Sequence, residues 1–145
     1  MVDAKSLAVK LESTLESVDI AEDMVKQYAV RYGFSEDALH QIGMAVRESV
    51  INAVVHGNGY SSQKKVSLGA QASGDGLTIT VQDQGAGFEL QEVPDPLADE
   101  NLMRKSGRGL FLIRAFMDDL RVRRIGEGSE LVMVKNYSPQ AKEEA

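Results

Sequence analysis

Three polar side chains share one face of an otherwise apolar helix, and their types could bind a metal ion and accept a proton. Glu48, Asn52 and His56 are spaced four residues apart, so an α-helix would place them in one row. The residues around them are mostly apolar, which is typical of a buried helix. Because a buried carboxylate needs a partner or a polar ligand, the row favours a binding site. Glutamate and asparagine together suit an oxygen-liganded cation such as Mg²⁺ with a carboxylate base beside it.

Each of the three side chains also has a common structural interpretation. Glu48 could form a salt bridge near Arg47 or with another helix, and Asn52 could bond to backbone in the core. His56 could be a helix C-terminal residue that the macrodipole stabilises. Taken singly, each of these structural roles is commoner than catalysis. Their alignment on one apolar helix nevertheless favours a functional site.

Two glycine-containing segments could bring backbone close to a ligand. Asp83 follows an expected strand and precedes Gly85 and Gly87, which tolerate positive φ and the close approach of a flat ligand. Gly107 and Gly109 open an expected helix, whose N-terminal N–H groups favour an anion. The structural alternatives are a tight turn in which Asp83 bonds its own backbone, and an ordinary glycine start to a helix.

Ten of the 13 glycines occur in five Gly-x-Gly pairs, which we interpret differently. One pair predicts a hairpin turn and another the end of a helix, namely Gly74/Gly76 and Gly57/Gly59. The other three pairs are expected to surround one ligand: Gly85/Gly87, Gly107/Gly109 and Gly126/Gly128.

Hydrophobic periodicity predicts the elements that must position these side chains. Strands are expected at residues 7–11, 65–70, 77–82, 120–124 and 130–135. Helices are expected at residues 19–32, 36–56 and 109–117, the second with Ser35 as its N-cap. Because hairpins connect most of the strands, this order predicts an α+β fold. We expect a two-layer α/β sandwich with a mainly antiparallel mixed sheet and three helices on one face.

The composition bounds the class of protein. The 145 residues fit one domain, expected at residues 1–137 with a flexible tail at 138–145. No Cys and two His exclude disulfides and thiolate chemistry and disfavour a zinc enzyme. A net charge of -6 disfavours nucleic acid and acidic membranes as partners. The sequence shows no signal core and no membrane span, so the cytoplasm is the expected location.

In chain order, three segments resemble the N box and glycine boxes of the Bergerat-fold (GHKL) ATPases: Glu48–Gly57, Asp83–Phe88 and Gly107–Leu110. The resemblance spans about residues 7–135 and implies the Bergerat ATP-binding fold. Within this superfamily, the short length and the segment Gly107–Asp119 are most similar to the anti-sigma factor serine/threonine kinases of bacterial partner-switching systems.

The resemblance implies a role for each motif position. Glu48 would be the general base, Asn52 would coordinate the Mg²⁺ that bridges the ATP phosphates, and Asp83 would accept a hydrogen bond from the adenine amino group. Residues 88–106 would form the ATP lid. Ser129 stands where the family usually has Thr, and its hydroxyl is expected to contact the surroundings of adenine, directly or through water. The remaining expected nucleotide-binding residues are His56, Gly85, Gly87, Gly107, Arg108, Gly109 and Leu110.

The activity that the resemblance implies is ATP- and Mg²⁺-dependent protein serine/threonine phosphorylation. The substrate would be an anti-sigma factor antagonist, the other partner would be a sigma factor, and the family suggests a homodimer. Two alternatives are a non-catalytic nucleotide-binding module that sequesters a partner and a detached histidine-kinase catalytic domain. Glu48 favours the enzyme, since a pure binder needs no base. The histidine-kinase interpretation would require a preceding helical hairpin with a phosphoacceptor His, and the sequence does not show one.

Overall fold

The computed structural model describes residues 6–85 and 109–137, and there the chain alternates between a sheet and a layer of helices. The N-terminal half contains β1 (Leu7–Glu12), α1 (Glu16–Ala29), the 3₁₀-helix η1 (Val30–Tyr32), α2 (Glu36–Ile51) and the π-helix η2 (Asn52–Gly57). The rest contains β2 (Lys65–Ala72), β3 (Gly76–Gln82), α4 (Gly109–Phe116), β4 (Asp119–Ile125) and β5 (Gly128–Asn136).

The five strands form one sheet in the order β1-β2-β3-β5-β4. Every strand pair in the described part of the chain is antiparallel, so the mainly antiparallel sheet is confirmed and the expected parallel component is not found there. The hairpins β2–β3 and β4–β5 account for two of the pairings. The antiparallel pairing of β3 with β5 joins the two hairpins and places the end of β3 beside the beginning of β5.

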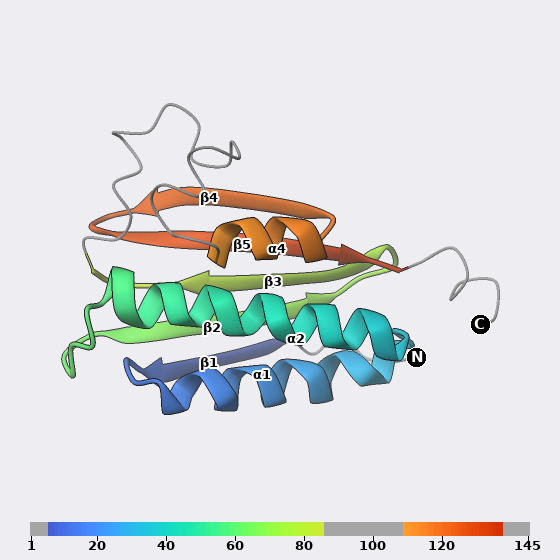
Figure 1. Cartoon of the computed structure of the whole chain (residues 1–145), viewed down its shortest axis with the longest axis horizontal. Helices are drawn as coiled ribbons and strands as arrows, with labels where there is room; N and C mark the ends of the chain where they lie inside the picture. The colour runs from blue at the N-terminus through green and yellow to red at the C-terminus, as the bar shows by residue number, and fades with distance from the viewer. Residues whose placement is uncertain (1–5, 86–108, 138–145) are drawn as a thin grey trace.

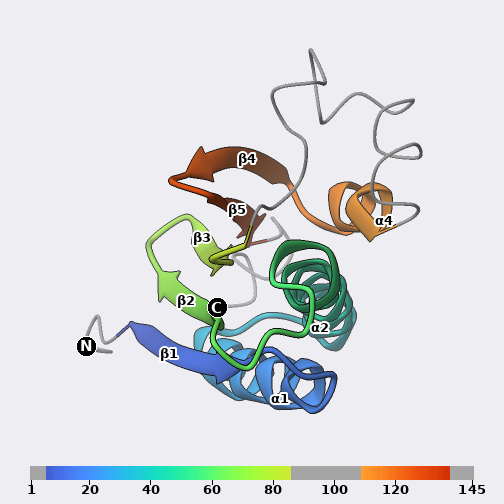
Figure 2. The same cartoon turned by 90° about the vertical axis from the view of Figure 1, so that its left-hand side faces the viewer.

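The helices α1, α2 and α4 lie on one face of the sheet, which confirms the two-layer α+β sandwich (Figures 1 and 2). Ile42, Val46 and Val50 project from α2 into the core at helical spacing and are fully buried. Leu77, Ile79 and Val81 face them from alternate positions of β3. Burial of each such side chain contributes about 1.5–3 kcal/mol, so this interface holds α2 against the centre of the sheet.

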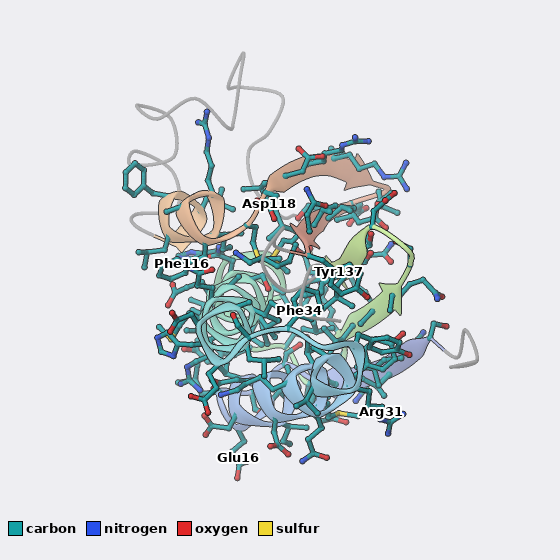
Figure 3. All side chains as sticks on the ribbon, turned by 90° about the vertical axis from the view of Figure 1, so that its right-hand side faces the viewer. Glu16, Arg31, Phe34, Phe116, Asp118 and Tyr137 are labelled. Carbon is teal, nitrogen blue, oxygen red and sulfur yellow. The ribbon has the colours of Figure 1, made fainter. Side chains whose placement is uncertain are left out.

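Aromatic side chains close the core at the end of the sheet where β2 turns into β3. The rings of Phe34 and Tyr137 lie 4.9 Å apart there (Figure 3). The Tyr28 hydroxyl accepts a hydrogen bond from the Ala72 N–H at 3.0 Å.

Among the described helices, none combines the length and the apolar character that a bilayer span requires.

A cap, a glycine and core burial set the ends of the first two helices. The Ser35 hydroxyl accepts a hydrogen bond from the Ala38 N–H at 3.1 Å, which confirms Ser35 as the N-cap of α2. Gly33 ends η1 with a φ of 83°, a conformation that glycine adopts without strain. Helix α1 begins at Glu16, three residues earlier than predicted, because Ser17 and Val18 in that first turn are buried against the core.

The continuous α-helix predicted up to His56 is wrong for its last five residues. The α-helix ends at Ile51 and the chain continues as a π-helix, closed by a hydrogen bond from the Asn58 N–H to the Ala53 carbonyl at 2.8 Å. This wider turn changes the side-chain spacing, so the predicted row is interrupted. Asn52 is buried, whereas His56 is exposed.

Gly74 and Gly76 differ, although both were interpreted as turn residues. A Cβ at Gly76 would lie 2.3 Å from the Lys135 carbonyl oxygen on β5, whereas a Cβ at Gly74 would meet nothing within 4 Å. We expect Gly76→Ala to lower the free energy of unfolding by about 1–3 kcal/mol, because the β3–β5 pairing must shift. The matched control Gly74→Ala should stay within about 0.5 kcal/mol of wild type. Urea denaturation measures both, and equal stabilities would contradict the close contact.

Candidate functional site

Asp83 directly follows β3 and carries a buried carboxylate that the structure satisfies with three donors. The residue is 5% exposed. The Ser129 hydroxyl donates to Oδ2 at 2.8 Å, while the Ser129 N–H and the Gly85 N–H each donate to Oδ1 at 3.2 Å. A carboxylate accepts about four hydrogen bonds, so Oδ2 retains capacity for one more donor.

Glycines bring the backbone close to Asp83 and its neighbours, at distances that no Cβ would permit. A Cβ at Gly57 would lie 2.3 Å from the Asp83 Cγ, and one at Gly128 would lie 2.0 Å from the Asp83 carbonyl oxygen. A Cβ at Gly85 would lie 1.6 Å from the Gly57 carbonyl oxygen. Gly57 was expected only to end a helix, and the structure shows that it also packs on Asp83. Bare backbone therefore forms the wall beside this acceptor.

Burial raises the pKa of the Asp83 carboxyl above its ordinary value of 3.8. The hydrogen bonds from Ser129 and Gly85 and the positive charge of Lys64 oppose this rise, because each favours the ionised form. The site therefore combines a desolvated acceptor with donors that hold its orientation.

Glu48, Asn52 and Gly109 form a second group, where α2 and η2 meet the beginning of α4. A Cβ at Gly109 would lie 3.1 Å from the Asn52 Nδ2 and 3.4 Å from the Glu48 Oε1. Glycine therefore allows the N-terminal end of α4 to approach both side chains. The two groups lie at the same end of the molecule, where η2 ends, β3 ends and α4 begins (Figures 1 and 2).

The side-chain nitrogen of Asn52 lacks a hydrogen-bond partner in the described part of the chain. The residue is 3% exposed, and its Nδ2 is buried without an acceptor there. Leaving a buried donor unpaired costs roughly 1–3 kcal/mol. A polar ligand beside α4 would remove this cost, so the structural role considered for Asn52, a core amide bonded to backbone, does not describe it.

Glu48 is half-buried and forms no hydrogen bond or ion pair with the other described residues. The salt bridge considered for it involves its neighbour instead. Arg47 binds Asp19 at 2.6 Å and Glu22 at 2.8 Å. Within residues 6–85 and 109–137, the Glu48 carboxylate is therefore available as a base.

The other predicted site residues divide into three cases. His56 is exposed at the end of η2. Leu110 is 2% exposed and its side chain belongs to the core, so a ligand contact would involve its backbone. Three expected ligand residues and the expected lid lie outside the described residues: Gly87, Gly107, Arg108 and residues 88–106.

Asn58 is a site residue that the sequence interpretation missed. It is 4% exposed, and its side chain donates to the Ser13 hydroxyl and the Lys65 carbonyl and accepts from the Gln84 N–H. Its place between Gly57 and Gly59 led to its interpretation as part of a helix end. An amide-bearing residue directly after the helix was the available signal, but its partners are distant in sequence.

Comparisons with known proteins agree on one family. Residues 11–135 match the family model of the histidine kinase-like ATPase domain. The chain is 31% identical over 144 residues to the serine-protein kinase RsbW of Listeria monocytogenes serovar 1/2a, covering 95% of this chain and 91% of the relative. It is 32% identical over 126 residues to the anti-sigma F factor of Clostridium perfringens strain SM101, covering 85% and 90%.

Two solved structures share the fold. The RsbU and RsbW domains of a Mycobacterium tuberculosis protein superpose with a TM-score of 0.66 at 18% identity, covering 91% of this chain and 32% of that one. A histidine kinase domain from Erythrobacter litoralis superposes with a TM-score of 0.59 at 19% identity, covering 88% and 63%. These likenesses confirm the expected ATP-binding fold class.

The raised pKa of Asp83 predicts a pH dependence of stability. The folded protein keeps this proton to a higher pH than the unfolded chain, so the stabilisation is fully present below about pH 3.8 and is lost as the pH rises through the folded pKa. The free energy of unfolding of the wild type, compared with that of Asp83→Asn, should therefore fall as the pH rises from about 4 through the pKa of Asp83 in the folded protein. Urea denaturation across this range tests it, with Asp75→Asn at the exposed hairpin as the control. Parallel curves for wild type and Asp83→Asn would contradict the raised pKa.

Proposed function

The chain belongs to the histidine kinase-like ATPase domain family, and on this basis we propose that it is an ATP-dependent protein serine/threonine kinase that acts as an anti-sigma factor. Its substrate is an anti-sigma factor antagonist, its second partner is a sigma factor, and it works as a homodimer. The observation that carries the proposal is the pair of Glu48 and Asn52 against the beginning of α4.

Asp83 recognises adenine in this proposal. The spare acceptor capacity of Oδ2 suits the exocyclic amino group of adenine, and the backbone of Gly57 and Gly85 forms a flat wall beside it. Ser129 fixes the carboxylate by its hydroxyl and its N–H, so the acceptor does not rotate away from the base.

Asn52 and the beginning of α4 hold the phosphates. The helix start presents N–H groups that favour an anion, and Gly109 keeps that surface open. The Asn52 carboxamide supplies an oxygen for Mg²⁺ and an N–H for a phosphate oxygen, which satisfies the unpaired donor. Bound Mg²⁺ would neutralise charge on the transferring phosphoryl group.

Glu48 is the general base. Its Oε1 lies against the position of Gly109, so it faces the space where the beginning of α4 receives the phosphates. It accepts the proton of the substrate hydroxyl as that oxygen bonds to the γ-phosphorus and the bond to the ADP oxygen breaks. A half-buried carboxylate without a described partner favours this role over the sequestering module, which needs no base.

We expect Glu48→Gln to retain ATP binding but to lose phosphoryl transfer about 10²–10⁴-fold, because the amide keeps the shape and cannot accept the proton. Single-turnover transfer of labelled phosphate from ATP to a cognate anti-sigma factor antagonist measures the rate. The control Glu36→Gln makes the same chemical change in the exposed first turn of α2 and should leave the rate unchanged. Undiminished transfer by Glu48→Gln would refute the base assignment.

We expect Asp83→Asn to weaken ATP binding about 10–100-fold, because an amide nitrogen or a neutral oxygen replaces a charged acceptor. Isothermal titration calorimetry in the presence of Mg²⁺ measures the dissociation constant, and Asp75→Asn provides the matched control. Absence of ATP binding by the wild-type protein would overturn the proposed function itself.

A further inference from the structure

Every polar group of Asn58 is used inside the protein. Its backbone N–H donates to the Ala53 carbonyl at 2.8 Å, and its carbonyl accepts from the Ser61 N–H at 3.1 Å. Its Nδ2 donates to the Ser13 Oγ at 2.9 Å and to the Lys65 carbonyl at 3.0 Å. A buried amide with this complete set of partners is rigid, since each alternative rotamer would leave several groups unpaired.

The fifth hydrogen bond of Asn58 ends beside the adenine acceptor. Its Oδ1 accepts from the Gln84 N–H at 2.8 Å, and Gln84 directly follows Asp83. A Cβ at Gly85 would lie 3.1 Å from the Asn58 Cα, so the two backbone segments lie against each other. The Asn58 side chain therefore joins the end of η2 to the loop that carries Asp83.

The opposite side of Asn58 is fixed to elements that do not belong to the nucleotide site. Ser13 lies between β1 and α1, and its hydroxyl also donates to the Lys64 carbonyl at 2.6 Å. Lys65 begins β2, and its N–H donates to the Gln84 side-chain oxygen. Hydrogen bonds to Asn58 and Lys65 therefore fix Gln84 relative to the beginning of β2.

We propose that Asn58 is a positioning residue for base recognition: by holding Gln84 and its neighbour Gly85 in place, it aims the Asp83 carboxylate at the 6-amino group of a purine. The Gly85 N–H is one of the three donors to Asp83, and it moves with the Gln84–Gly85 backbone. Gly57, whose backbone lies against Asp83, directly precedes Asn58, so its position also depends on Asn58. This inference rests on the proposed function, since it assumes that ATP is the ligand.

The test compares the binding of ATP with that of purine riboside triphosphate, which lacks the 6-amino group. The wild type should bind ATP at least about tenfold more tightly, since one hydrogen bond to a charged acceptor distinguishes the two ligands. In Asn58→Ala this ratio should fall below about threefold. A merely structural role would leave the ratio at its wild-type value, because both ligands would lose affinity equally.

Two further variants distinguish a change in the position of the Asp83 carboxylate from a loss of protein stability. Asn58→Asp keeps an oxygen for the Gln84 N–H and should keep a ratio within about threefold of wild type, although it loses both donated bonds. Tyr28→Phe removes a buried bond to a backbone N–H at the far end of β2 and should lower the melting temperature without changing the ratio. A wild-type ratio in folded Asn58→Ala would overturn the inference.

A measurement on the wild type keeps the inference testable even if Asn58→Ala does not fold. The Gln84 amide should show slow hydrogen exchange in the free protein, because its N–H is bonded to Asn58. Exchange at the unprotected rate would overturn the inference alone. Failure of the wild type to bind ATP would overturn the proposed function and the inference with it.

Discussion

The burial of the Asp83 carboxylate is the constraint on which the site depends. Removing a carboxylate from water is costly unless several donors face it, so the fold must bring N–H and O–H groups to this point. The β3–β5 pairing does so, because Ser129 on β5 lies beside the end of β3: its carbonyl accepts from the Asp83 N–H, and its own N–H donates to the Asp83 carboxylate. The approach is so close that Gly57 and Gly128 have no room for a Cβ.

One short helical segment connects this acceptor to the proposed phosphate end of the site. Asn52 begins η2 and lies against Gly109, while Gly57 ends η2 and lies against Asp83. The two contacts are therefore separated by a single wide turn of backbone. Single π-helical turns are rare and recur at functional sites. Here the tertiary bonds of Asn58, which follows the turn directly, hold it in place.

The sequence predicted the elements with strong local signals and the motif positions that a family resemblance supplied. The strand and helix order follows from hydrophobic periodicity, and the relatives confirm the expected family and kinase role. The π-turn could not be predicted, because it depends on bonds from Asn58 to Ser13 and Gln84, distant in sequence. Gly57 was interpreted as a helix end for the same reason, since only the folded chain brings Asp83 against it.

Serine at position 129, where the family resemblance leads us to expect threonine, is compatible with this arrangement. Three hydrogen bonds join Ser129 to Asp83, and two of them use only the backbone of Ser129, so they do not depend on the side chain at position 129. The third is donated by the hydroxyl to Oδ2, the carboxylate oxygen with remaining capacity. Either residue type can supply that donor. Because the hydroxyl proton is directed to Asp83, only the oxygen lone pairs of Ser129 remain for a ligand or a water, and its main contribution to base recognition is to fix the acceptor.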